Sequence, residues 1–256
     1  MGNLDDRVAV VTGGATGIGL AAARLLAADG ATVMIAGRDA TRGEAAAEAI
    51  GAFGGRATFI ATDVTDDSQV AVLAKRAAAE HVGIDIWFNS AGMEGGLGSL
   101  GDFDDLTVRQ LLDTNIKGVY SGMRHAAEHM RAGAVIINNA SFVGTAIPVP
   151  VAVAYGATKA AVVSMTRAAA LGLADQGIDV FAVAPWIVDT PMIDRLTGGQ
   201  GRAARAAFAA QLNPSGTLIS PEHVAEVVAR LAGRTLPYRS GDVLLIDTGP
   251  SVTLMQ

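Results

Sequence analysis

The sequence predicts an α/β protein built on one doubly wound, parallel sheet of seven strands with helices on both faces. Two observations support this prediction. Short apolar runs alternate with longer segments of helix formers along the chain, which is typical of parallel strands joined by right-handed crossovers. A glycine-rich turn also joins the first strand to the first helix. Ligands of such sheets bind beyond the carboxyl ends of the strands, so residues that directly follow a strand are the functional candidates.

Each element is predicted from its own pattern. The strands are apolar runs bounded by glycine or polar residues, at Arg7–Val11, Thr32–Ala36, Ala57–Ala61, Ile84–Phe88, Ala134–Asn138, Ile178–Ala184 and Asp242–Ile246. The segments between them are long enough for crossover helices, at about Gly17–Asp29, Thr41–Ile50, Asp66–His81, Asp104–Arg131, Ala154–Asp175 and Pro221–Leu231.

The composition limits the classes of protein to which the chain can belong. Its 256 residues contain no Pro- or Ser-rich linker, which predicts one domain over residues 1–256. A net charge of -6 and scattered basic residues argue against a nucleic-acid partner. No apolar run approaches the roughly 20 residues that span a bilayer and the first residues lack a secretory pattern, so we expect a cytoplasmic protein without a membrane partner. The absence of cysteine excludes disulfides and thiolate chemistry.

The segment Thr12–Gly19 reads Thr-Gly-Gly-Ala-Thr-Gly-Ile-Gly and lies between an apolar strand and an apolar-periodic helix. Glycines let the backbone turn tightly and approach a pyrophosphate, while the helix N-terminus offers free N–H groups and a positive dipole end. The spacing differs from the commoner Gly-x-Gly-x-x-Gly, so an ordinary glycine-rich βα turn is the alternative. The context favours a phosphate cradle for a dinucleotide.

Residues after the second and third strands indicate how the adenosine half of that cofactor would bind. The second strand is followed by Gly37 where an acidic side chain would accept hydrogen bonds from the ribose of NAD, and then by Arg38, whose cation suits the 2′-phosphate of NADP. We therefore favour NADP, with NAD as the alternative because Asp39 could still bind a ribose hydroxyl. Asp63 follows the third strand and is a candidate acceptor for the adenine amino group, or a helix cap.

Tyr155 and Lys159 lie four residues apart and so share one face of a predicted helix. A tyrosine with a reference pKa of about 10 is a poor proton shuttle at neutral pH, but a lysine ammonium beside it favours the phenolate and is expected to lower that pKa. A packed phenol and a solvated amine are the alternative reading of the same spacing. Ser141 follows the fifth strand, and the helix that carries the pair comes next.

Together these motifs resemble the short-chain dehydrogenase/reductase family, in its compact type of roughly 250 residues. The resemblance covers essentially the whole chain and implies a Rossmann-like fold. It rests on Thr12-Gly13-x-x-x-Gly17-x-Gly19, Asn89-Ser90-Ala91-Gly92, Asn115 in Asn-Ile-Lys-Gly, Ser141-x-x-Gly144, Tyr155-x-x-x-Lys159, Pro185 to Thr190, and Asp247-Thr248-Gly249.

The resemblance implies a catalytic tetrad of Asn115, Ser141, Tyr155 and Lys159. In this tetrad Tyr155 exchanges a proton with the carbonyl or alcohol oxygen, and Ser141 hydrogen-bonds that oxygen. Lys159 binds the nicotinamide ribose and lowers the tyrosine pKa. Asn115 holds a water linked to the lysine. Hydride transfer belongs to the nicotinamide. The implied cofactor-binding residues are Gly13, Thr16, Gly17, Ile18, Gly19, Arg38, Asp63, Val64, Asn89, Ala91, Gly92, Tyr155, Lys159, Pro185, Val188 and Thr190, with Thr190 on the carboxamide.

Three departures from the family pattern concern the substrate side. Ser90 replaces the second Asn of Asn-Asn-Ala-Gly, a small change expected to be tolerated. Trp186 follows Pro185 where the family has Gly, and its large indole is expected to occupy substrate or cofactor space. The interval from Ser141 to Tyr155 is one residue longer than in many members, which we interpret as a loop bulge.

These residues predict an NADP-favouring oxidoreductase that acts on carbonyl or secondary-alcohol substrates. The cleft is expected from Met93–Leu97, Phe142–Val151 and Trp186–Gln211, with a lid at about residues 186–215. A 3-oxoacyl thioester reductase is the first alternative, because Arg195, Arg202 and Arg205 could attract an acyl-carrier or CoA tail. A non-catalytic dinucleotide-binding sensor or scaffold is the second. No metal is required, and a homotetramer or homodimer is implied by the resemblance. The apolar candidates for contact with a small-molecule substrate are Met93, Phe142, Val149, Trp186 and Met192.

Overall fold

The computed structural model describes residues 4–81, 83–145, 148–199, 201–212, 217–247 and 252–255. Part of the predicted substrate loop (residues 146 and 147) and of the predicted lid (residues 200 and 213–215) lies outside these ranges, as do Thr248 and Gly249 of the last family motif. The side chain of Arg202 is also outside the described part of the chain.

One sheet of eight strands runs through the protein, in the order β3-β2-β1-β4-β5-β6-β7-β8. The first seven strands pair in parallel, which confirms the predicted doubly wound α/β fold; the eighth, which the sequence did not predict, pairs antiparallel with β7 at the edge. The strands are β1 Val8–Thr12, β2 Thr32–Gly37, β3 Arg56–Ala61, β4 Ile84–Asn89, β5 Met130–Asn139, β6 Asp179–Pro185, β7 Val243–Ile246 and β8 Val252–Met255.

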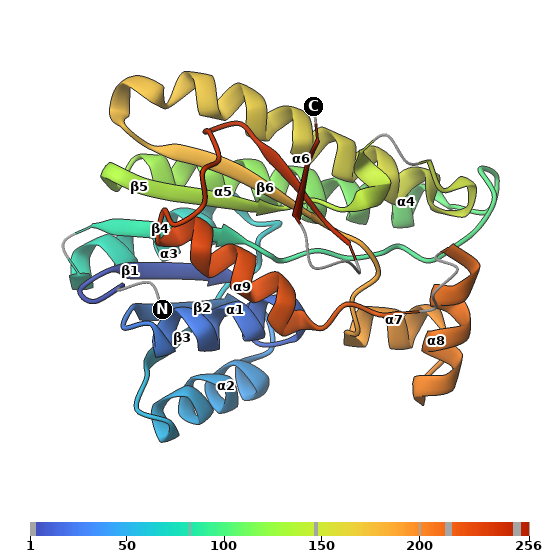
Figure 1. Ribbon diagram of the computed structural model, residues 1–256, viewed down its shortest axis with the longest axis horizontal. Helices are drawn as coiled ribbons and strands as arrows, with labels where there is room; N and C mark the ends of the chain where they lie inside the picture. The colour runs from blue at the N-terminus through green and yellow to red at the C-terminus, as the bar shows by residue number, and fades with distance from the viewer. Residues whose placement is uncertain are drawn as a thin grey trace.

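Helices cover both faces of the sheet (Figure 1). Apolar side chains of α1, α2 and α9 pack in one buried cluster against one face, and those of α3, α5 and α6 pack in a second cluster against the other. The helices are α1 Gly17–Ala28, α2 Ala40–Ala52, α3 Asp67–His81, α4 Asp105–Leu112, α5 Gly118–Ala127, α6 Val153–Gly172, α7 Pro191–Leu196, α8 Gly201–Leu212 and α9 Pro221–Ala232. Within the described ranges, no helix is long and apolar enough to cross a membrane.

The helix predicted over Asp104–Arg131 differs from the structure in two ways. It is divided into α4 and α5 by a π-helical turn, Asp113–Lys117, which carries Asn115. It also ends earlier, because β5 begins at Met130 rather than Ala134 and pairs there with Ile84 of β4. Pairing with a neighbouring strand thus overrides the helical pattern at the end of this segment.

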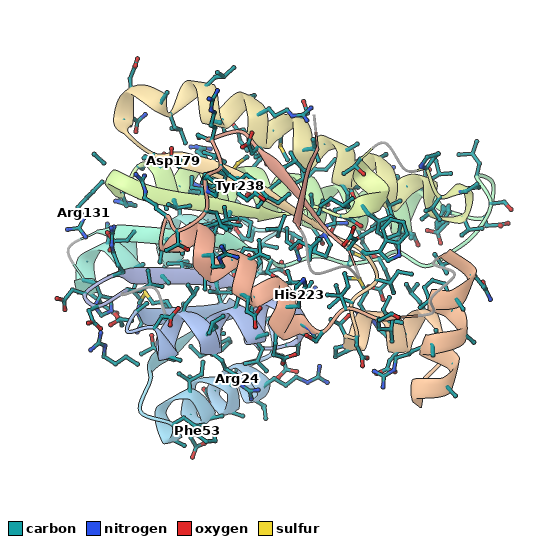
Figure 2. The ribbon with its side chains drawn as sticks, in the orientation of Figure 1. Arg24, Phe53, Arg131, Asp179, His223 and Tyr238 are labelled. Carbon is teal, nitrogen blue, oxygen red and sulfur yellow. The ribbon has the colours of Figure 1, made fainter. Side chains whose placement is uncertain are left out.

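Charged side chains close the end of the sheet that lies away from the candidate site. Arg131 near the start of β5 and Arg7 both contact the nearly buried carboxylate of Asp85, with N to O distances of 2.9 and 3.1 Å. Figure 2 shows Arg131 at the amino ends of the strands, whereas α7 and α8 lie beyond the carboxyl ends. The functional candidates therefore belong to the carboxyl end. There the neighbouring strands β1 and β4 have connections that leave in opposite directions.

Candidate active site

A cavity of about 590 Å³ opens at the carboxyl ends of the strands. Its wall comes from turns after β1, β4, β5 and β6 together with α6, α7 and α8, so segments far apart in the chain meet here. Among the predicted site residues, the following line it: Gly13, Thr16, Gly17, Ile18, Gly19, Ala91, Gly92, Ser141, Phe142, Val149, Tyr155, Lys159, Pro185, Trp186, Val188, Thr190 and Met192.

The glycine loop has the shape of a cradle in which side chains would not fit. A Cβ on Gly13 would meet the backbone of Ala91 at 2.8 Å, and a Cβ on Gly19 would meet the carbonyl of Gly13. Gly17 has a φ of 52°, which favours glycine. Helix α1 starts at Gly17 and its N-cap, Thr16, makes no side-chain capping bond, so the first-turn N–H groups face the cavity without that partner. These residues fit the pyrophosphate of a dinucleotide.

The residues predicted for the adenosine half lie beside this cavity, not in its wall. Arg38 is exposed directly after β2, and no hydrogen bond or ion pair of its side chain is found within the described ranges. Asp39 instead caps α2: its carboxylate accepts from the backbone N–H of Arg42 at 3.0 Å and pairs with the Arg42 guanidinium at 3.2 Å. Asp63 accepts two hydrogen bonds from Thr65.

Two predicted cofactor contacts, Asn89 and Val64, have side chains that belong to the core. The Asn89 amide accepts from the Trp87 indole N–H at 2.7 Å and donates to Asn138 at 2.9 Å. Val64 is buried, and a Cβ on Gly118 would meet the Val64 side chain at 2.9 Å. Any contact of Asn89 with a cofactor is therefore left to its backbone, while its side chain holds the end of β4.

Tyr155, Lys159 and Ser141 all line the cavity, with Tyr155 and Lys159 on one helix face as their spacing predicted. Tyr155 and Lys159 come from α6, and the Lys159 ammonium lies 5.6 Å from the centre of the Tyr155 ring. Lys159 is buried and donates to the backbone carbonyl of Asn139 at 2.7 Å. Ser141, at the end of β5, hydrogen-bonds with Tyr155. A Cβ on Gly144 would collide with the backbone of Lys159, which explains the glycine of the Ser141-x-x-Gly144 motif.

The electrostatics of this group differ from the sequence-based expectation. Burial raises the pKa of Tyr155 to about 12; the hydrogen bond with Ser141 opposes this rise, and the negative charge of Glu94 adds to it. Burial also lowers the pKa of Lys159 to about 8. The predicted lowering of the tyrosine pKa is thus wrong, because burial penalises the charged form of Tyr155 and raises its pKa instead. Tyr155 therefore keeps its proton at neutral pH.

Asn115 lies in the π-helical turn and is fully buried. Its amide donates to the carbonyl of Met93 at 2.9 Å and to the Thr158 hydroxyl at 3.1 Å, and its oxygen accepts from the Met93 N–H at 2.9 Å. Both amide hydrogens are therefore used, and Asn115 ties the loop after β4 to helix α6. Met93 is held by this contact and does not line the cavity.

The rest of the wall is mostly apolar. The rings of Phe142 and Trp186 stack with centroids 4.0 Å apart at an interplanar angle of 28°. They belong to a small cluster with Ile187, Ile193 and Ala209 that joins the sheet to α7 and α8. The indole lines the same cavity as Val149 and Met192.

The two lid arginines with described side chains are already paired with carboxylates. Arg195 in α7 contacts Glu94 with both Nε and Nη2, at 2.6 and 3.0 Å. Arg205 in α8 contacts Asp189 at 2.5 Å and Asp194 at 3.4 Å. Neither is left as an uncompensated cation for an anionic tail.

Sequence reasoning missed several wall residues. Asn139 and Ala140 line the cavity at the end of β5 and could have been found by the strand-end rule that selected Ser141. Glu94 lies within the predicted substrate segment but was not recognised as a charged wall residue. Its partner Arg195 is 101 residues away, and no local pattern connects them.

Comparison with known proteins identifies the family. Residues 13–251 match the family model described as enoyl-(acyl carrier protein) reductase. The chain is 40% identical over 246 residues to cis-4-hydroxycyclohexanecarboxylate dehydrogenase of Sinomonas cyclohexanicum, covering 95% of this chain and 96% of the relative. The chain belongs to the short-chain dehydrogenase/reductase family.

Two further proteins match over a similar share of the chain. The chain is 35% identical over 252 residues to 3beta-hydroxysteroid dehydrogenase 1 of Eggerthella lenta, covering 96% of this chain and 94% of the relative. A short-chain dehydrogenase from Burkholderia cenocepacia, solved in complex with NADP, matches with a TM-score of 0.85 and 33% identity over 96% of this chain and 98% of that one. The protein is thus an oxidoreductase of this family that transfers a hydride between a nicotinamide cofactor and a carbonyl or secondary alcohol.

The buried ammonium of Lys159 predicts a pH-dependent stability. In the unfolded chain the lysine keeps its proton to a pKa near 10.5, whereas the folded site releases it near 8, so between these values the unfolded state binds more protons and stability rises with pH. From pH 7 to 10.5 the wild type should therefore gain about 2–3 kcal/mol relative to Lys159→Met. Urea unfolding at several pH values measures this difference. The exposed Lys75→Met variant is the control, and its difference from the wild type in free energy of unfolding should not change with pH. If the difference for Lys159→Met were also independent of pH, the prediction would be wrong.

Proposed function

We propose that this enzyme interconverts alicyclic secondary alcohols and their ketones, that it favours NADP over NAD, and that Tyr155 is its proton-transfer residue. The observation that carries the proposal is the meeting of Ser141, Tyr155 and Lys159 with the glycine cradle around one largely apolar cavity. The two named relatives are dehydrogenases of a hydroxycyclohexane carboxylate and of a hydroxysteroid, and the alicyclic rings of both substrates suit such a wall.

The proposed chemistry divides between cofactor and chain. A bound nicotinamide would supply or accept the hydride. In the direction of reduction, the Tyr155 hydroxyl gives its proton to the carbonyl oxygen and Ser141 hydrogen-bonds the same oxygen. Lys159, held by the Asn139 carbonyl, offers a cation to the phenolate that forms and to a ribose hydroxyl. Asn115 keeps the loop after β4 in place against α6. Oxidation reverses these proton movements.

The preference for NADP rests on the end of β2. Asp39 is engaged as the cap of α2, and Arg38 beside it is exposed. A guanidinium in this place suits a 2′-phosphate, whereas Gly37 provides no carboxylate for a ribose diol. We propose that Asp63 and Val64 border the adenine, and that Thr190 binds the carboxamide of the nicotinamide.

The thioester reductase ranks second as a candidate. Its tail would need cations at the lid, and Arg195 and Arg205 are paired with Glu94, Asp189 and Asp194. The apolar stack of Phe142 and Trp186 instead favours a ring-shaped substrate.

We further propose that residues 1–256 form one cytoplasmic domain in which residues 186–215 act as a lid. Gly198, Gly199 and Gly201 join α7 to α8 with φ values of 69°, 72° and 79°, which suits a hinge between the two helices. A homotetramer or homodimer is proposed because large apolar side chains remain exposed on α4, α5 and α6, namely those of Leu106, Leu112, Tyr120, Val153 and Leu171.

The central test is Tyr155→Phe. Removing only the hydroxyl is expected to lower kcat/KM by about 10²-fold or more, because the proton donor is lost, while the Kd for NADPH stays within about three-fold. Activity is followed by nicotinamide absorbance over a panel of cyclopentanol, cyclohexanol, 4-hydroxycyclohexanecarboxylate, a 3β-hydroxysteroid and a 3-hydroxyacyl thioester. Tyr120→Phe, on the exposed face of α5, is the matched control. A Tyr155→Phe enzyme that keeps near wild-type turnover would rule out the assignment.

The cofactor preference is tested by Arg38→Ala. Loss of a charge-assisted contact of about 1.5–3 kcal/mol should raise the Kd for NADPH by at least about ten-fold and leave that for NADH nearly unchanged. Fluorescence titration with both cofactors measures this, with Arg76→Ala on the exposed face of α3 as the control. Equal affinity of the wild type for NADPH and NADH would overturn the proposal.

Trp186 is predicted to set the size of the substrate. Trp186→Gly should enlarge the cavity and raise the ratio of kcat/KM for the 3β-hydroxysteroid over cyclopentanol by about ten-fold, whereas Trp186→Phe should change it little. The ratio cancels general losses from weakened packing. An unaltered substrate ranking in Trp186→Gly would show that the indole does not limit the cavity.

A further inference from the structure

Glu94 is a carboxylate in the wall of the catalytic cavity, and the mechanism above does not use it. It lies on the loop after β4, where its side chain is only 14% exposed. Arg195 reaches it from α7 and contacts both carboxylate oxygens, at 2.6 and 3.0 Å. A forked contact of this kind is geometrically specific and fixes the guanidinium against the acid.

Four charged side chains lie in the described part of the cavity wall that contains Tyr155. Lys159 comes from its own helix, Glu94 and Asp102 from the segment after β4, and Arg195 from the lid. Asp102 is exposed and accepts from the backbone N–H of Ser99, so solvent screens its charge. Glu94 is shielded from solvent, and its negative charge raises the pKa of Tyr155.

We propose that Arg195 serves as a lid-borne counter-ion for Glu94, and that the pair tunes proton transfer by Tyr155. Glu94 alone would oppose formation of the phenolate, because two negative charges would then share one partly desolvated site. The Arg195 side chain is 59% exposed but contacts both carboxylate oxygens directly, so it compensates the charge of Glu94 only while α7 lies against the loop after β4. Docking of the lid helix therefore eases proton release at the phenol, and both are positioning residues rather than catalytic ones.

A mechanical clamp is the competing explanation for the same contact. In that case loss of either partner would weaken the lid in the same way, and both variants would change KM in one direction. Charge tuning instead predicts opposite effects of the two variants on the pH profile. Arg205 offers a matched control, since it pairs with Asp189 and Asp194 inside the lid but does not line the cavity.

The experiment compares Glu94→Gln, Arg195→Gln, the double variant and Arg205→Gln as full-length enzymes. It records kcat/KM against pH for oxidation of the fastest alcohol of the panel with NADP⁺. Glu94→Gln should displace the rising acidic limb to lower pH and Arg195→Gln should displace it to higher pH, each by about half a pH unit or more. This is about a three-fold change in rate at a fixed pH on that limb, so the midpoint itself need not be reached. The double variant, without either charge, should return close to the wild type.

The inference rests on the proposed role of Tyr155, and the two can fail separately. If Tyr155→Phe retains turnover, the proposed function itself is wrong. If Tyr155→Phe is inactive but both single variants leave the acidic limb in place, or displace it in the same direction, the tuning role is overturned. A shift in Arg205→Gln as large as that in Arg195→Gln would also overturn it, because the effect would then belong to lid packing.

Discussion

The close approach of two chain turns, after β1 and after β4, is the constraint on which the rest of the site depends. The Thr12 hydroxyl accepts from the backbone N–H groups of Ser90 and Ala91 at 3.2 and 3.3 Å, and Gly13 lies so close to Ala91 that a side chain would not fit. The strand order reverses between these two strands, so their connections leave in opposite directions and open a crevice. The contact between the turns brings the start of α1 and the loop carrying Glu94 to the same cavity.

Burial is the second constraint, and it governs the chemistry. Gly144 lets the turn after β5 pack directly on α6, which buries Lys159 against the Asn139 carbonyl and places Ser141 beside Tyr155. Within such a site each charge is stabilised by its few neighbours rather than by water. This explains why a single carboxylate in the wall matters to the phenol and why its pairing with the lid has a consequence for proton transfer.

These constraints explain which parts of the protein could be predicted from the sequence. Local patterns predict the seven parallel strands and the group of Tyr155, Lys159 and Ser141. A strand, a βα turn and an i,i+4 pair each depend on residues that are close together in the sequence. The edge strand β8, the early start of β5 and the pairing of Glu94 with Arg195 depend on contacts with distant segments. The direction of the Tyr155 pKa was mispredicted for the same reason, since spacing reports the neighbouring lysine but not the depth of burial.

The proposed cofactor and substrate halves of the cavity differ in how they are built. The cofactor half is shaped by backbone, because glycines at Gly13 and Gly19 leave room that any side chain would fill. The substrate half is shaped by side chains on a rigid frame: the N–H of Trp186 donates to the Ile246 carbonyl at 2.8 Å, which continues the pairing of β6 with β7 and fixes where the indole begins. The indole then stacks on Phe142, which follows Ser141 directly. A change at Trp186 would therefore alter the surface next to Ser141 without altering the strand that carries the indole, and under the proposed mechanism this separation would let substrate size vary while the catalytic geometry stays constant.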